Sequence, residues 1–131
     1  PSRCAPNTGI LYKTTINQSG GGSNYLQVFD CVADMQVIFG LDNNEDGVLD
    51  TYSDDITSLS AVNIKKRVKE VRVYILTHEG NKDNDYTYRS GTITIGEFDK
   101  GHDFNLTSTI GSGWQNYKWK QRILVLKPKD F

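Results

Sequence analysis

The sequence predicts an α+β domain whose sheet is mainly antiparallel. Residues 71–76 and 92–98 are rich in β-branched and aromatic side chains, which favours strands. Residues 117–128 alternate apolar and basic side chains, which is typical of a long, partly exposed strand. Ile64 and Val68 lie four residues apart in a lysine-rich segment, which predicts one short helix with an apolar face.

Before residue 42, the sequence indicates strands separated by a glycine-rich connector. Residues 10–12 fit a short strand, and residues 19–23 (Ser-Gly-Gly-Gly-Ser) form a flexible connector. Residues 25–29 are brief and apolar-rich. Residues 32–39 follow, and the second half of this segment alternates like a strand before it runs into an acidic loop.

After that loop, residues 54–61 contain a candidate helix start. The strand at 71–76 carries apolar side chains on both faces, as expected for a strand covered on both sides. Residues 79–85 consist of turn formers, and residues 101–113 are expected to be a polar connection. The apolar residues expected to anchor this connection are Phe104, Leu106 and Ile110.

In the last strand, Trp119 is expected to fill the core, while Lys118, Lys120 and Arg122 point the other way. Pro128 is expected to end the ladder because it has no N–H to donate.

The length of 131 residues is sufficient for one core, so residues 1–131 are predicted to form a single domain. The formal net charge of −1 gives no support for nucleic-acid binding. The basic run Lys65-Lys66-Arg67, followed by Lys69, is a DNA-binding candidate, but a solvated helix face explains it better.

No apolar run approaches the roughly 20 residues of a membrane span. Because the chain opens on Pro1 and shows no signal peptide, we expect that an N-terminal anchor has been removed.

Cys4 and Cys31 are the two cysteines, and they predict a disulfide in an oxidising compartment. Such a bond would stabilise the fold by about 3–4 kcal/mol on the chain-entropy estimate. The alternative is a pair of unrelated buried thiols. His78 and His102 lack zinc-ligand spacing to these cysteines, which disfavours a zinc site, and both histidines are expected on the surface.

The segment from residue 42 to residue 50 places oxygen-bearing side chains at alternating loop positions. Asp42, Asn44, Asp46 and Asp50 occupy positions 1, 3, 5 and 9, and Gly47 at position 6 permits a sharp reversal of the chain. The Val48 carbonyl would supply a further oxygen at position 7. Calcium prefers six to eight such oxygens, so this loop predicts a calcium site.

The match to an EF-hand is incomplete, because Ser53 stands where the bidentate glutamate is expected. Asp54 and Asp55 follow and could supply the missing carboxylate from a differently shaped loop. The alternative is an ion-free polar turn, since Asp, Asn and Gly are common turn residues.

Together, three stretches resemble the globular domain of a PilW-like minor pilin of type IV pili. They are residues 30–42 with the acidic loop that follows, residues 68–76, and residues 117–131 with their closing basic-proline-basic run. The J-type pseudopilin of type II secretion is similar in plan and stays an alternative. The peptidase-recognition segment of pilins is absent from this sequence.

The resemblance implies a pilin-like sheet that packs on a missing N-terminal helix, which would be the subunit's one membrane contact. It also implies a role in starting pilus assembly at or near the tip. The expected partners are other minor pilins and the major pilin. The expected location is extracytoplasmic: inner membrane and periplasm before assembly, then the cell surface.

The sequence allows three classes of function: a calcium-stabilised structural subunit, a calcium-dependent adhesive or carbohydrate-binding module, and an enzyme. The structural subunit is preferred. Trp114, in a glycine-flanked loop, is the candidate ring for a binding surface. Neither GxSxG nor HExxH occurs, so no enzymatic activity and no small-molecule substrate are expected.

Overall fold

The computed structural model of the protein describes residues 2–16 and 23–127. Its contacts divide the chain into two compact units. Unit 1 comprises Pro1–Asp34, Leu76–Thr92 and Asn105–Lys120, and unit 2 comprises Met35–Ile75, Ile93–Phe104 and Gln121–Phe131. The single-domain expectation for residues 1–131 stays a prediction.

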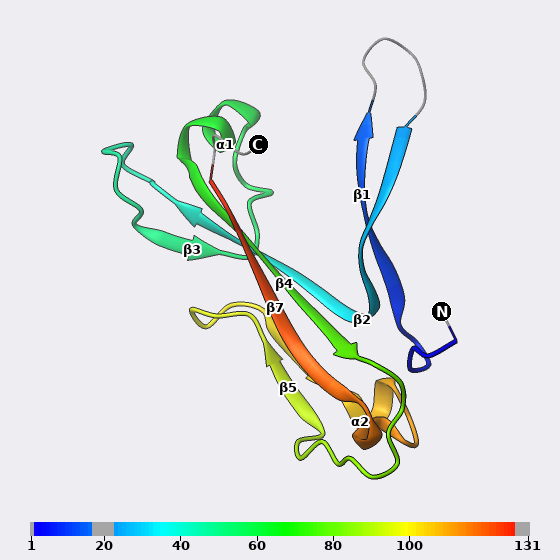
Figure 1. The fold of residues 1–131 in the computed structure, drawn as a ribbon. Helices are drawn as coiled ribbons and strands as arrows, with labels where there is room; N and C mark the ends of the chain where they lie inside the picture. Colours follow the sequence, from blue (N-terminus) through cyan, green and yellow to red (C-terminus); the bar gives the residue numbers. More distant parts are fainter. Residues whose placement is uncertain (1, 17–22, 128–131) are drawn as a thin grey trace. The chain divides into compact units, whose positions relative to one another are not determined.

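Strands dominate the described chain (Figure 1). One sheet has the order β1 (Gly9–Ile16), β2 (Ser23–Leu41), β4 (Val68–Glu79) and β7 (Lys118–Leu126), and β3 (Thr51–Ser53) pairs with β2. A separate two-stranded sheet joins β5 (Thr92–Ile95) to β6 (His102–Asn105). The helical segments are α1 (Ala61–Arg67), α2 (Leu106–Thr109) and a 3-10 turn at Trp114–Asn116. The predicted α+β class with a mainly antiparallel sheet is confirmed.

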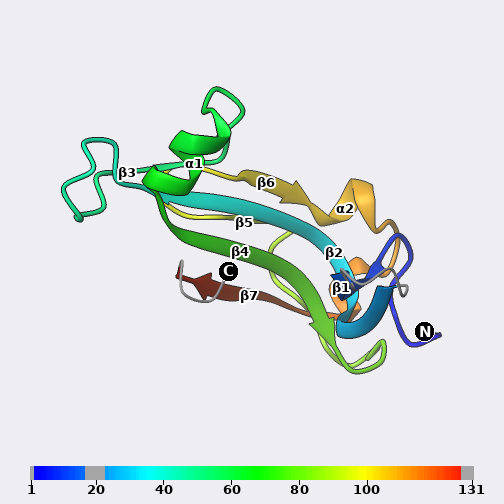
Figure 2. The ribbon, with the colours of Figure 1, turned by 90° about the horizontal axis from the view of Figure 1, so that it is seen from above.

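The long strand β2 belongs partly to each unit, and β4 runs beside it in both views (Figures 1 and 2). In unit 1, β1 pairs antiparallel with β2. Gly9 lies opposite Val32 and Leu11 opposite Phe29, so β2 holds one extra residue in this interval. Cys31 lies there with φ of 52°, a left-handed conformation that is uncommon for a non-glycine residue. The strand therefore carries a β-bulge at its cysteine.

The core of unit 1 forms around aromatic and aliphatic side chains that the sequence pattern had assigned to the interior. Trp119 is buried, as predicted, and its Nε1 donates to the Trp114 carbonyl at 2.9 Å. Leu106 and Ile110 are also buried, as expected for anchors of the 101–113 connection. That connection is more regular than predicted, because it contains β6 and α2, which begins after the Asn105 cap.

The core of unit 2 includes Ile38, Tyr74, Ile75 and Phe104. Residues 74 to 78 of β4 are all buried, so the strand predicted at 71–76 is covered on both faces in its second half, whereas residues 71 to 73 are half-buried.

The helix begins later than the sequence indicated. Ser60 caps α1 by accepting a bond from the Asn63 N–H, and the seven-residue helix starts at Ala61. Asp55 Oδ1 instead accepts the Thr57 N–H at 2.9 Å, a local turn that competes with helix formation. Val68 is not part of the helix; it begins β4 and is buried.

The strand predicted at 92–98 ends at Ile95. Phe98 and Asp99 both have φ of 59°, and the Lys100 N–H donates to the Glu97 carbonyl at 3.0 Å. This geometry is a tight turn with two left-handed central residues, which reverses the chain into β6. The connector expected at 19–23 and the strand stop at Pro128 lie outside the described residues, apart from Ser23 in β2.

We predict that Gly40→Ala destabilises the protein. A Cβ at Gly40 would lie 2.5 Å from Leu49 Cδ1 and 3.0 Å from Glu70 Cβ, so neighbouring atoms would have to move. Overpacking of this kind costs about 1–3 kcal/mol of unfolding free energy, which chemical denaturation measures. Gly9→Ala is the matched control in a strand, because a Cβ there meets nothing within 4 Å. Equal stability of the two variants would contradict the prediction.

Candidate functional site

The acidic loop leaves β2 in unit 2 and is closed at its base by backbone bonds. The Asp50 N–H donates to the Leu41 carbonyl at 2.7 Å. The Asp42 N–H donates to the carbonyl of Arg67, the last residue of α1, at 2.8 Å. The loop is therefore fixed both to the strand from which it leaves and to the junction between α1 and β4.

Asp42 is the organising side chain of this loop and is 0% exposed. Its Oδ1 accepts the Asp46 N–H at 3.1 Å, and its Oδ2 accepts the Gly47 N–H at 2.7 Å. Gly47 has φ of 89°, the reversal for which a glycine was predicted. Burial by itself would raise the pKa of Asp42, but the backbone donors outweigh it and hold the pKa below its usual value. The carboxylate is therefore charged at neutral pH.

Further oxygens converge on the same loop. Asp46 Oδ1 accepts the Val48 N–H at 2.9 Å, and Asp50 Oδ2 accepts the Asn43 N–H at 2.9 Å. Carboxylate oxygens of Asp42, Asp46 and Asp50 all lie within 4.8 Å of one another. Asn44 Oδ1 lies in the same loop and accepts the Asp46 N–H at 3.3 Å. The loop thus concentrates negative charge and hard oxygen donors, the chemistry that suits a divalent cation.

Two predicted ligands have other partners. Asp54 Oδ2 accepts the Gly101 N–H at 3.4 Å. Asp55 Oδ1 accepts both the N–H and the hydroxyl of Thr57, and these bonds lower the pKa of Asp55. Neither residue belongs to the group of three converging carboxylates found among residues 2–16 and 23–127. The Val48 side chain is exposed, so only its backbone carbonyl is relevant to a cation.

Cys4 and Cys31 form a disulfide, as the sequence predicted, with their Cα atoms 4.9 Å apart. The bond fixes the N-terminal segment to the bulge of β2 within unit 1. Arg3 pairs with Asp30, and Thr77 Oγ1 donates to the Asp30 carbonyl at 2.7 Å. The bulge is therefore held from two sides, by the N-terminal segment and by β4.

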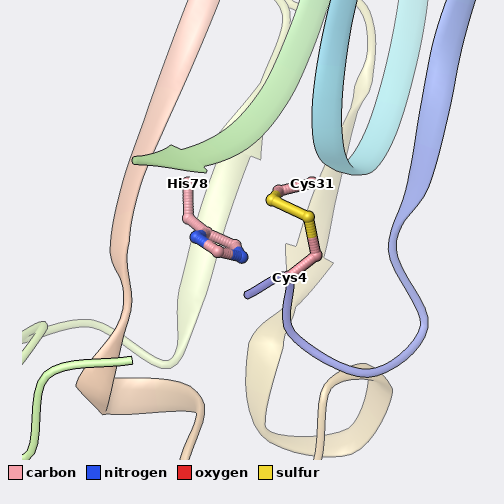
Figure 3. A group of neighbouring side chains, drawn as sticks. All are labelled: Cys4, Cys31 and His78. Carbon is pink, nitrogen blue, oxygen red and sulfur yellow. A yellow bond between two sulfur atoms is a disulfide. The ribbon is translucent and has the colours of Figure 1, made fainter. Parts of the chain in front are cut away.

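His78 lies beside this disulfide (Figure 3). The expectation that His78 lies on the surface is wrong, because the residue is only 3% exposed. Its ring centroid lies 4.6 Å from that of Tyr117 and 5.1 Å from that of Trp119. A signal was present in the sequence: no turn former separates the apolar run 73–76 from His78, so the strand continues through it.

The hydrogen bonding of His78 defines its protonation state. Nε2 accepts the Ala5 N–H at 2.9 Å, so the neutral ring carries its proton on Nδ1. Burial lowers the pKa of His78, and the Arg3 charge acts in the same direction. The backbone of Glu79 and Gly80 and the Asp30 charge act in the opposite direction but do not compensate. The neutral imidazole therefore acts as a structural acceptor that fastens residue 5 to β4.

Trp114, the predicted surface-binding ring, is half-buried. A Cβ added at Gly91 would lie 3.6 Å from Trp114 Cζ2, so the indole packs against this glycine. Part of the ring is consequently occupied by contacts within unit 1.

The family model described as PilW, type IV pilus-assembly protein W, matches residues 2–110 of the chain. No curated protein and no solved structure is similar enough to count as a match. Within the described parts of the chain, no helix has the length and hydrophobicity needed to cross a bilayer.

We predict that His78 makes stability depend on pH. The pKa of His78 is lower in the folded state than in the unfolded chain. Just below pH ~6.5, the ordinary histidine value, the His78 ring therefore binds a proton in the unfolded chain but not in the folded protein. Neutral His78 therefore contributes fully to the free energy of unfolding above that pH. This contribution is lost as the pH falls toward the lower pKa of the folded state. Urea denaturation between about pH 7.5 and 5 measures this loss.

The His78→Gln variant should lack this part of the pH dependence, whereas His102→Gln, at an exposed position, should retain it. Parallel stability curves for the wild-type protein and His78→Gln would show that His78 is not the responsible group.

Proposed function

The chain belongs to the PilW family of type IV pilus-assembly proteins, and from this premise we propose that it is a minor pilin whose acidic loop is braced by calcium. Family membership makes it a component of pilus assembly with an extracytoplasmic location. The proposal adds the ion, a structural role without catalysis, and a place at or near the pilus tip. The inner membrane and periplasm before assembly, and the cell surface afterwards, are the corresponding locations.

The observation that carries the calcium proposal is the convergence of three carboxylates around a preorganised backbone turn. Asp42, Asp46 and Asp50 would each contribute oxygen, with Asn44 Oδ1 and the Val48 carbonyl as further donors. Without a cation, the three negative charges repel one another at this distance. Calcium tolerates irregular oxygen geometry at about 2.3–2.6 Å, whereas magnesium demands a tighter octahedron and retains water.

The position of the loop explains what an ion would do. The loop base bonds to Leu41 at the end of β2 and to Arg67 at the end of α1. An ion that binds only the folded loop would stabilise both connections, because binding to the native state alone shifts the folding equilibrium. We propose that calcium thereby fixes the surface of unit 2 for contact with other subunits.

Other minor pilins and the major pilin are the proposed partners. In β7, the side chains from Ile123 to Leu126 are exposed although all four are apolar. This apolar strand supports the proposal that a helix outside the present sequence, of the kind that the family resemblance implies, packs on the sheet. The J-type pseudopilin of type II secretion stays an alternative assembly role of the same kind.

The adhesive or carbohydrate-binding alternative rests on a free aromatic surface at Trp114. The contact of this indole with Gly91 leaves less of the ring available for a sugar. The family match instead supports the structural subunit as the better-supported function.

We predict that calcium raises the unfolding free energy of the protein and that Asp46→Ala abolishes this effect. Calcium at 100 times its Kd would add about 2.7 kcal/mol if it binds only the folded state. Denaturation with calcium and with a chelator measures the difference. Asp85→Ala removes an exposed carboxylate outside the loop and should keep the full response. The same unfolding curve with calcium and with chelator in the wild-type protein would contradict the calcium proposal.

We further predict that deleting the gene reduces surface pili and that the wild-type gene restores them. The Asp46→Ala gene should restore fewer pili than the wild-type gene at calcium concentrations that occupy the wild-type loop, because an unbraced loop would weaken subunit contacts. Quantifying sheared pili tests this. Normal piliation in the deletion strain would contradict the assembly role independently of the metal result.

A further inference from the structure

Apart from the three-residue strand β3, the described sheet has two edge strands, and these differ in how well they are protected against pairing with another chain. The edge strand β7 carries Lys118, Lys120 and Arg122. Charged side chains along an edge disfavour pairing with another chain. The other edge strand, β1, has the sequence Gly-Ile-Leu-Tyr-Lys-Thr-Thr-Ile and carries one charge, Lys13. It contains no proline and is rich in the residues that favour strands.

The pairing of β1 leaves one side of the strand open. Among the described residues, β1 pairs with β2 alone. Register shifts interrupt the ladder between Gly9 and Tyr12, but residues from Tyr12 to Ile16 follow β2 in regular register. Alternate residues of such an edge strand direct their N–H and C=O groups away from the neighbour. This regular stretch therefore offers backbone donors and acceptors at strand spacing.

A hollow lies at the beginning of the same strand. Its volume is about 350 Å³, and it is lined by Cys4, Ala5, Thr8, Gly9, Ile10 and Tyr12. The walls are fixed: the disulfide holds Cys4, His78 accepts the Ala5 N–H, and Thr8 Oγ1 donates to the Ala5 carbonyl at 2.7 Å. The hollow is thus a preformed feature of unit 1, and residues of β1 itself form part of its lining.

Two exposed tyrosines, one on β1 and one on β2, lie near this edge. Tyr12 is 50% exposed and Tyr25, across the ladder on β2, is 72% exposed. Their rings meet edge to face with centroids 6.3 Å apart. Exposed tyrosines provide large contact area at low entropic cost and are common at protein interfaces.

We propose that the outer edge of β1 accepts an extended strand from a second polypeptide, with an aliphatic side chain in the hollow and a carboxylate opposite Lys13. A strand is the occupant because its backbone matches the repeating donors and acceptors of the edge, as in β-augmentation. The carboxylate follows from charge complementarity, since Lys13 is the one charged residue of β1. The remaining side chains of the occupant are uncharged, because the edge offers them no other ionic partner.

This inference goes beyond the proposed function and does not depend on calcium. It assigns unit 1 a partner-binding edge, whereas the acidic loop belongs to unit 2. Failure of either proposal leaves the other standing.

The test uses NMR titration of the ¹⁵N-labelled protein with a blocked peptide, acetyl-Thr-Val-Thr-Glu-Thr-Val-Thr-amide. Saturable shifts should concentrate on the amides of β1 and of the residues that line the hollow. Two N-methylated forms separate backbone pairing from side-chain contact: one is methylated at its threonines, and the other at its valines and glutamate. Since alternate residues of a strand bond on one edge, one form should lose binding and the other should keep it.

No saturable binding, equal behaviour of the two N-methylated forms, or shifts centred on β7 would each overturn the proposal.

A second peptide, with lysine in place of glutamate, tests the charge complementarity. The wild-type protein should bind the glutamate peptide several-fold more tightly. Lys13→Glu should reverse that preference, and Lys120→Glu, on the other edge strand, should not. An unchanged preference in Lys13→Glu would remove Lys13 from the binding edge.

Discussion

The buried carboxylate of Asp42 is the constraint on which the acidic loop depends. It accepts two backbone N–H groups from within the loop, and the backbone N–H of the same residue donates to the carbonyl at the end of α1. A charge removed from water is costly unless donors surround it, and here the backbone of the turn supplies them. The fold therefore places Asp46 and Asp50 beside a fixed negative charge. A divalent cation would offset the repulsion among the three carboxylates.

A second constraint acts in unit 1, where β2 bulges at Cys31. A left-handed cysteine is an unfavourable conformation for a strand, and the surrounding bonds maintain it. The disulfide, the Arg3–Asp30 pair and the Thr77 hydroxyl all converge on this bulge. The disulfide, together with the bond from the Ala5 N–H to His78 on β4, also holds the N-terminal segment that lines the hollow beside β1. The bulge and the proposed binding surface therefore both depend on the disulfide.

The sequence predicted the features that depend on local pattern. The β-branched and aromatic residues predicted β4, the alternating pattern predicted β7, and the two cysteines predicted the disulfide. The spacing of oxygen-bearing side chains marked the loop in which Asp42, Asp46 and Asp50 converge. The helix starts later than the sequence pattern predicts, because Asp55 forms a local turn and Ser60 provides the cap. The local sequence predicts a surface position for His78, whereas its burial depends on Tyr117 and Trp119, which are distant in sequence. The other engagements of Asp54 and Asp55, and the hollow beside β1, likewise arise from tertiary contacts that no local pattern encodes.

A crystal structure determined with calcium, together with anomalous diffraction, tests the central claim most directly. The account predicts an anomalous peak enclosed by Asp42, Asp46 and Asp50, at calcium–oxygen distances of about 2.3–2.6 Å. The backbone bonds to Asp42 should be retained around the ion. A loop without a peak at saturating calcium, with these carboxylates turned into solvent, would contradict the account.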